Sequence, residues 1–189
     1  MICPAPYLLL YLNFVFLMIL SKYFFKKGGT WTLERILALF PFLVAPYYLL
    51  CVLLGFAVPF FGTQTPVAEL LQAFSVFFSV GAFILTAYTV GCHRQPVSLC
   101  HQPNDSPDHL VNYGSYRLVR HPLYTAHLLV LAGVFVLAPH WISLLLFVYG
   151  FIIFNMTARQ EEALFLKSKF AAEYSDYMKT TGRFLPRWF

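Results

Sequence analysis

Five long apolar runs limit most strongly what this chain can fold into. They lie at residues 7–25, 36–61, 70–90, 122–138 and 141–157, and a helix that crosses a lipid bilayer needs about 20 mostly apolar residues. Only 11% of the residues are charged, against roughly 25% in a soluble domain. The sequence therefore predicts an all-α integral membrane protein, with one domain over residues 1–189 and no cleavable signal peptide.

The positive charges indicate how these runs are oriented. All 13 Lys and Arg residues lie in three segments: residues 22–35, from the end of the first run to the second; residues 94–120, between the third and fourth runs; and residues 159–187, after the fifth run. Cytoplasmic segments of membrane proteins carry the excess of Lys and Arg. We therefore expect five transmembrane helices, with the N-terminus outside and the C-terminus in the cytoplasm. The connector 91–121 and the C-terminal helix and tail 158–189 then share the cytoplasmic face.

The last two runs are short and almost adjacent. Only Ala138-Pro139-His140 separates them, which predicts a tight helical hairpin with Trp141 at the far interface. We expect the last helix to continue past Met156 into an amphipathic stretch that ends near Met178. The second run is expected to be kinked or broken because three prolines interrupt it: Pro41, Pro46 and Pro59.

The segment from Gly114 to Tyr124 gathers cations, phenols and an imidazole directly before an apolar run. Pro122 suits the first turn of a helix, whose free amides can receive a carboxylate. Tyr116 and Tyr124 offer aromatic faces for a flat base or a sulfonium cation. On the residue types alone, an interfacial anchor is the slightly better interpretation.

Two further groups carry chemistry. Glu161 and Glu162 follow the fifth run by one turn, where a carboxylate is costly unless it is solvated or paired. A repeated Cys-His dipeptide offers four soft ligands, but its spacing matches no common metal site, and we expect no metal: Cys92, His93, Cys100 and His101. We expect His127 to be a packed polar residue.

Two of these stretches together resemble a known family. Residues 110–124 read L-V-N-Y-G-S-Y-R-L-V-R-H-P-L-Y and resemble the signature of the isoprenylcysteine carboxyl methyltransferases, roughly L-V-x-x-G-x-Y-x-x-x-R-H-P-x-Y. A second part of the family pattern, E-E…F-G-x-x-Y-x-x-Y and a closing turn, is matched by Glu161-Glu162, Phe170, Glu173-Tyr174, Tyr177 and Arg183-Phe-Leu-Pro186. The resemblance covers residues 108–187, the half expected to bind the cofactor.

The resemblance implies S-adenosyl-L-methionine as cofactor, bound in a pocket that faces the cytoplasm. Of the two glutamates, Glu162 aligns better with the family's residue for the cofactor's ammonium group. The family often has a histidine two residues before the Leu-Val pair; that position is Asp108 here, followed by His109, and either residue could serve. The implied cofactor-binding residues are Asp108, His109, Leu110, Val111, Tyr116, Arg120, His121, Pro122, Leu123, Tyr124, Glu161 and Glu162.

The resemblance also implies an arginine that contacts the acceptor's carboxylate. A gapless count places Ala158 at that position, with Arg159 beside it. Arg159 and Glu162 are therefore the residues expected to act in catalysis. Ala171 replaces the glycine that usually follows the phenylalanine, which we expect to change only a turn.

The first functional hypothesis is methyl transfer to a lipophilic acceptor, namely the carboxylate of an isoprenylcysteine-like substrate, which is already ionised at pH 7. Phospholipid N-methylation and small-thiol S-methylation remain open, and an amine acceptor would need a base, for which His127 is the nearest candidate. Two other classes remain: an NADPH-dependent, sterol-reductase-like enzyme and a non-enzymatic metal-handling membrane protein. The expected partners are the lipid bilayer and a lipophilic or lipidated substrate, without nucleic acid; the oligomeric state stays open.

Overall fold

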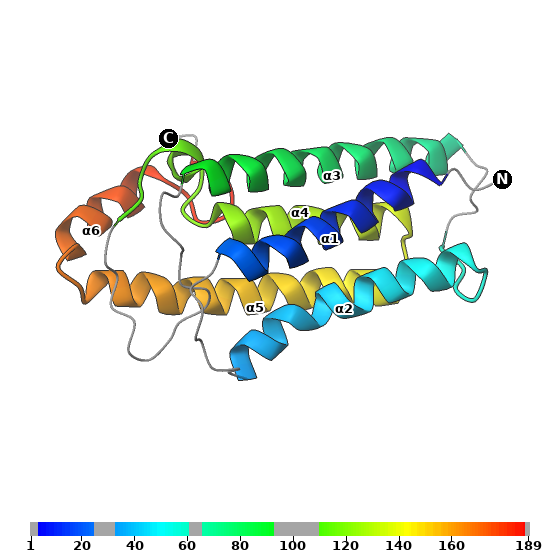
Figure 1. Ribbon diagram of the computed structural model, residues 1–189, viewed down its shortest axis with the longest axis horizontal. Helices are drawn as coiled ribbons and strands as arrows, with labels where there is room; N and C mark the ends of the chain where they lie inside the picture. The colour runs from blue at the N-terminus through cyan, green and yellow to red at the C-terminus, as the bar shows by residue number, and fades with distance from the viewer. Residues whose placement is uncertain (1–3, 25–32, 61–65, 93–109, 188–189) are drawn as a thin grey trace.

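The computed structural model describes residues 4–24, 33–60, 66–92 and 110–187, and within them all regular structure is helical. The all-α prediction is therefore confirmed. Long helices run alongside one another, and α6 lies apart at one end (Figure 1). The elements are α1 (Ala5–Phe24), α2 (Leu33–Leu53), α3 (Pro66–Cys92), the 3-10 helix η1 (Gly114–Arg117), α4 (Pro122–Leu137), α5 (Trp141–Leu166) and α6 (Ala171–Thr180).

Three of the described helices are long and apolar enough to cross a membrane: α2 over Ile36–Leu53, α3 and α5. Shorter apolar helices cover Ala5–Leu20 and Pro122–Leu137, which correspond to the first and fourth predicted spans. The chain is thus a helical membrane protein. The crossing of the membrane by five helices, the transmembrane hairpin and the orientation stay predictions.

Helix α2 ends earlier than the apolar run that predicts it. The run extends to residue 61, but the helix ends at Leu53, and Pro41 and Pro46 both lie inside it. Gly55 has a φ of 79°, and the amides of Phe56 and Ala57 both donate to the Cys51 carbonyl, at 2.8 and 3.2 Å. A left-handed glycine with such returning hydrogen bonds is a common helix end. The helix therefore stops at a glycine cap and not at Pro59.

The connection between α4 and α5 consists of residues 138–140 and is held by hydrogen bonds. His140 accepts from the Ile142 amide at 3.2 Å, and the Ser143 hydroxyl accepts from the His140 amide at 3.1 Å, which makes a capping box. The Tyr48 hydroxyl donates to the Ala138 carbonyl at 2.8 Å and so ties α2 to this turn. The N-terminus of α5 is thereby fixed against the end of α4.

Helix α5 continues past Met156 to Leu166, and the amphipathic stretch after it is a separate helix, α6. The Ser168 hydroxyl stabilises the turn between them: it donates to the Phe165 carbonyl at 2.8 Å and accepts from the Phe170 amide at 3.1 Å. Because of this turn, α6 comes to lie beside the 110–117 segment and can form the site from a second direction.

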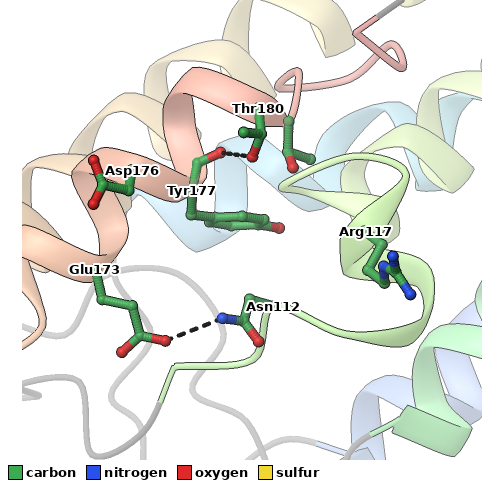
Figure 2. Close-up of a pocket in the computed structure, with 7 residues that line it drawn as sticks. Asn112, Arg117, Glu173, Asp176, Tyr177 and Thr180 are labelled. Atoms are coloured by element: carbon green, nitrogen blue, oxygen red, sulfur yellow. Dashed lines mark hydrogen bonds between the residues drawn. The ribbon is translucent and has the colours of Figure 1, made fainter.

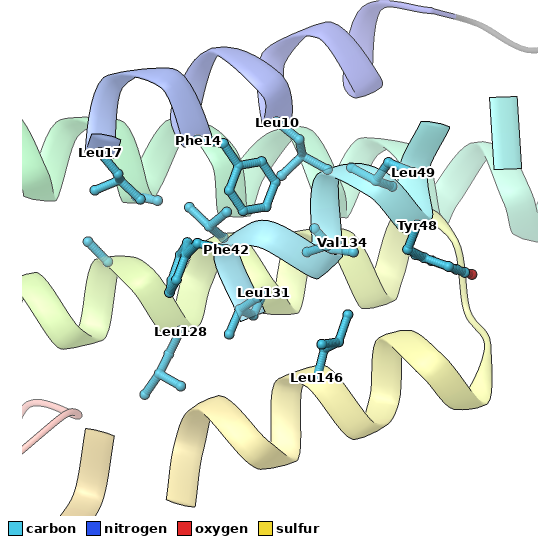
Figure 3. Close-up of a cluster of buried hydrophobic side chains, with 14 of the residues drawn as sticks. Leu10, Phe14, Leu17, Phe42, Tyr48, Leu49, Leu128, Leu131, Val134 and Leu146 are labelled. Atoms are coloured by element: carbon cyan, nitrogen blue, oxygen red, sulfur yellow. The ribbon is translucent and has the colours of Figure 1, made fainter. Parts of the chain in front are cut away.

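Helix α4 is the central helix of the bundle and contacts α1, α2, α3 and α5. Its Leu131 and Val134 are almost completely buried, among side chains of α1 and α2 such as Leu10 and Phe42 (Figure 3). Many large apolar side chains on the other helices face outward, as expected for a surface that contacts lipid. The N-terminus of α4, which carries the candidate site, is thus anchored on several sides.

Candidate functional site

One buried carboxylate, Glu162 on α5, lies at the centre of the candidate site. Its side chain is only 5% exposed. Arg120 donates to its Oε1 through Nε at 3.1 Å and Nη2 at 2.9 Å, and His121 Nε2 lies 3.2 Å from the same atom. Arg183 grips both carboxylate oxygens, with Nε at 3.0 Å from Oε1 and Nη2 bonded to Oε2. We call Arg120, His121, Glu161, Glu162 and Arg183 the Glu162 cluster.

A carboxylate is expensive to bury unless cations and hydrogen bonds compensate for its lost hydration. Glu162 has both, since the two arginine contacts are charge-assisted and the Arg183 contact is bidentate. The hydrogen bonds and positive charges around it favour the ionised form. Glu162 is therefore an ionised group that organises the three cations around it.

The cations are brought to Glu162 by two backbone segments that run side by side. The Arg120 amide donates to the Gly182 carbonyl at 2.8 Å, and the His121 amide donates to the Arg183 carbonyl at 3.1 Å. Val119 and Gly182 form an isolated parallel bridge. We call residues 181–187 the C-terminal strap. It crosses the start of α4 because these hydrogen bonds satisfy amides that precede the helix.

Arg120 also fixes the end of α6. Its Nη1 donates to the carbonyls of Met178, at 3.4 Å, and Thr181. These carbonyls lie at the C-terminus of α6, where a cation is favoured by the helix dipole. Arg120 is only 8% exposed and therefore joins α4, α5 and α6 from inside the structure.

Glu161 occupies a more open position than its neighbour. Its side chain is 22% exposed, and it accepts a hydrogen bond from the Tyr124 hydroxyl at 2.6 Å. His121 Nδ1 lies 3.4 Å from its Oε2, so the imidazole bridges both glutamates. Burial lowers the pKa of His121, but the hydrogen bonds with Glu161 and Glu162 raise it by more, and the net shift is upward. Both ring nitrogens of His121 face carboxylate oxygens, which favours the protonated imidazole.

An aromatic layer supports the imidazole from the bundle side. The rings of His121 and Tyr124 are stacked with centroids 5.6 Å apart, and Tyr124 stacks on Phe154 at 5.2 Å. His127 lies one layer deeper, against Phe154 and Phe42, and its Nδ1 is 2.6 Å from the Leu123 carbonyl. His127 is therefore a packed residue with its hydrogen bond to the backbone.

The other expected cofactor residues lie at varied depths. The Tyr116 carbonyl accepts from the Tyr177 hydroxyl at 2.5 Å, and this bond ties η1 to α6. Pro122 is buried in the first turn of α4, as predicted, while Leu110, Val111 and Leu123 are half-buried. Asp108 and His109 lie outside the described residues, so their shared position stays a prediction.

The structure separates the two residues expected to act in catalysis. Glu162 is at the centre of the cluster, whereas Arg159 is exposed. The arginine that pairs with Glu162 on the strap side is Arg183, whose Nη1 also donates to Asn155 Oδ1 at 2.6 Å. Sequence reasoning placed Arg183 only in the closing turn and missed its contact with Glu162. Asn155 had no signal in the sequence.

A groove of about 490 Å³ lies between the 112–117 segment and α6 (Figure 2). The Asn112 side-chain amide donates to Glu173 Oε1 across it at 3.0 Å. Tyr177 and Thr181 belong to its wall and also contact the segments that hold the Glu162 cluster. The full lining is Asn112, Arg117, Glu173, Asp176, Tyr177, Thr180 and Thr181. Its lining residues have polar side chains, and Thr181 links the groove to Arg120 of the cluster.

Of the four residues considered as metal ligands, only Cys92 is described. It is buried at the end of α3, 4.0 Å from the Ser115 hydroxyl and against Gly114. His93, Cys100 and His101 lie outside the described residues. Within residues 4–24, 33–60, 66–92 and 110–187, no three His, Cys, Asp or Glu side chains are placed to share a metal ion.

Comparison with known proteins points to methyl transfer. The family profile described as "Phospholipid methyltransferase" matches residues 99–173. The matched segment contains the Arg120-His121-Pro122 and Glu161-Glu162 motifs, and it confirms the resemblance of residues 99–173 to membrane methyltransferases. Among curated proteins, none matches the chain.

Proposed function

We propose that this chain is an S-adenosyl-L-methionine-dependent membrane methyltransferase that methylates a lipophilic acceptor at the Glu162 cluster. One observation carries the proposal. Two motifs about 40 residues apart, both inside the segment similar to phospholipid methyltransferases, meet in a single network in which Arg120, His121 and Tyr124 contact Glu161 and Glu162.

The residues of the cluster fit such a cofactor. Glu162 already accepts hydrogen bonds from three cationic side chains, so it has little capacity left for an ammonium group. Glu161 is more exposed and has fewer partners, since it accepts from the Tyr124 hydroxyl and lies 3.4 Å from His121 Nδ1. We therefore assign the cofactor's ammonium group to Glu161 and give Glu162 the role of holding the surrounding cations in place. The bound cofactor supplies a sulfonium methyl group as the electrophile.

The protein's part in such a reaction is alignment and exclusion of water. Attack on a sulfonium methyl is an in-line displacement, which depends mainly on the relative placement of the two reactants. The Tyr124 ring is fixed between His121 and Phe154, and this holds its hydroxyl on Glu161. The C-terminal strap covers the start of α4 and limits the access of water.

The charges in the cluster favour an acceptor that is already ionised. An amine must lose a proton before it can attack, whereas a carboxylate is anionic at pH 7. Both ring nitrogens of His121 lie against carboxylates of Glu161 and Glu162, so neither is free to take a proton from an acceptor. We therefore propose the carboxylate of an isoprenylcysteine-like molecule as the acceptor.

Phospholipid N-methylation is the second candidate, because the matching family profile carries that description. The proton would then go to His127, whose Nδ1 faces the Leu123 carbonyl and leaves Nε2 as the accepting atom. The measured preference of the protein for an isoprenylcysteine-like carboxylate or for a phospholipid amine decides between the two candidate functions.

The topology belongs to the same proposal. The distribution of all 13 Lys and Arg residues supports five spans with the Glu162 cluster on the cytoplasmic side. The cofactor then enters from the cytosol and a lipophilic acceptor from the bilayer. Labelling of single cysteines at the two ends of the predicted spans, in sealed vesicles, tests this arrangement.

The function is tested with detergent-purified protein. S-adenosylhomocysteine should bind saturably in calorimetry, and Glu161→Gln should weaken the binding about tenfold or more, since a charge-assisted hydrogen bond is lost. Transfer of labelled methyl groups to N-acetyl-S-farnesylcysteine and to phosphatidylethanolamine then identifies the acceptor. Binding of NADPH without binding of S-adenosylhomocysteine would refute the proposal.

A further inference from the structure

The position where the family resemblance expects an acceptor-binding arginine holds no arginine in this chain. That position is Ala158, which is fully buried, and the adjacent Arg159 is exposed on α5. Residues 155, 158 and 162 lie along one face of α5, because side chains three, four and seven positions apart in a helix are neighbours. Ala158 therefore leaves space on the face that carries Glu162.

Arg183 places its guanidinium over this face from the C-terminal strap. It donates from Nη1 to Asn155 Oδ1 at 2.6 Å and from Nε to Glu162 Oε1 at 3.0 Å. Because the Arg183 guanidinium is bonded to both Asn155 and Glu162, it spans the roughly two helical turns between them, where Ala158 lies. Arg183 thus occupies, from the strap, the region that an arginine at position 158 would reach from the helix.

The guanidinium of Arg183 keeps donors for a ligand. Arginine has five N–H groups in a planar fork, and three of them serve Asn155 and Glu162. The other two meet no acceptor within residues 4–24, 33–60, 66–92 and 110–187. The side chain of Arg183 is 24% exposed, against 8% for Arg120, which uses four of its donors on Glu162 and the α6 carbonyls.

The charges of the cluster leave room for one more anion. Arg120 and Arg183 contribute two positive charges that balance Glu161 and Glu162, and His121, whose two ring nitrogens both face these carboxylates, adds positive charge in its protonated form. The net positive charge is partly buried, where it attracts an anion more strongly than in water. A carboxylate or phosphate matches the two free donors of Arg183 in shape as well as charge.

We infer that Arg183, oriented by Asn155, binds the anionic group of the acceptor and takes the role that the sequence assigned to Arg159. The inference rests on the proposed function and deepens it. The acceptor is a lipophilic molecule with a carboxylate or a phosphodiester near the methylated atom. Arg183 is a specificity-determining residue, because a neutral acceptor of equal size gains nothing from its donors.

The test compares anionic and neutral ligands in the presence of saturating S-adenosylhomocysteine. The probes are N-acetyl-S-farnesylcysteine, its neutral carboxamide, and a phosphatidylethanolamine as the phosphodiester. Wild-type protein should bind at least one anionic probe about tenfold or more tightly than the carboxamide, the range expected for a hydrogen bond to a charged group. The anionic probe that shows the preference identifies the source of the anion.

Arg183→Gln should remove this preference, measured at concentrations of S-adenosylhomocysteine that saturate the variant. Arg183→Lys should keep part of it, because lysine has the charge without the fork. Arg187→Gln, an exposed arginine four residues further along the strap that donates to Met178 and Lys179 carbonyls, is the matched control and should keep the full preference.

Asn155→Leu gives a second route if Arg183→Gln does not fold. It removes only the acceptor that orients Nη1 and should reduce the preference severalfold. Equal binding of all three probes to the wild type, or an unchanged preference in both Arg183→Gln and Asn155→Leu, would overturn the inference. Loss of the preference in Arg159→Gln alone would return the role to Arg159. Failure of S-adenosylhomocysteine to bind the wild type would instead refute the proposed function.

Discussion

Replacing Glu162 by glutamine removes the charge on which the candidate site is built. The substitution keeps the shape of the side chain, but it leaves Arg120, which is 8% exposed, without its counter-ion. It also removes one of the two oxygens gripped by Arg183. Removing one partner of a buried ion pair costs about 3–5 kcal/mol. Since about 1 kcal/mol lowers the melting temperature of a chain of this size by roughly 2–4 °C, we expect a loss of about 6–20 °C.

The assay is thermal unfolding in detergent, with Asp176→Asn as the matched control. Asp176 also pairs with a cation, Lys179 at 2.7 Å, but both side chains are more than two-thirds exposed. An exposed pair is worth about 0–1 kcal/mol, so this variant should unfold within a few degrees of the wild type. Adding Arg183→Gln to Glu162→Gln should cost less than the sum of the two single changes, because the residues are in direct contact. Equal melting temperatures for Glu162→Gln and Asp176→Asn would show that the buried carboxylate does not hold the cations.

Two further predictions follow from His121 and Gly114. The pKa of His121 is raised above its ordinary value of 6.5, so its contribution to stability is complete below about pH 6.5 and is lost as the pH rises through the pKa of the folded protein. The melting temperature measured from about pH 6 to 9 should therefore fall less steeply in His121→Gln than in the wild type. An unchanged slope would contradict this prediction. Gly114 has a φ of 64°, and an added Cβ would lie 2.1 Å from the Cys92 sulfur. Gly114→Ala should therefore lower the free energy of unfolding, measured with denaturant, by more than Gly55→Ala does. Gly55 has a φ of 79° and open space around it, so its substitution adds only the backbone strain of about 1–2 kcal/mol.

The sequence predicts the helices well where their apolar runs end in clear signals. The run at 36–61 is the exception, because apolar residues continue beyond the helix end. There α2 ends at Leu53 because Gly55 adopts a positive φ and the amides after it bond back to the helix. Hydropathy does not detect such a cap.

The candidate site shows the same division. The motifs predict Arg120, His121, Tyr124 and Glu162, because the resemblance carries them together, and the structure brings all four into contact. The motifs assign no role to Arg183 beyond the closing turn, and its position depends on how the strap returns over α4. A contact made through space by residues 21 positions apart follows from that path and not from any local pattern.

The strap has a consequence for the order in which the protein folds. Arg120 and Thr181 are 61 positions apart, so the contacts between the strap and the start of α4 close a long loop, whereas the helices form from local hydrogen bonds. Contacts between residues far apart in the sequence form late, because closing the loop between them costs conformational entropy. We expect the individual helices to form first and the ion cluster to close after them. The amides of Arg120 and His121, which donate to strap carbonyls, would then gain protection from hydrogen exchange after the amides inside α4 and α5, and the protein would pass through a helical state in which its chemistry is not yet assembled.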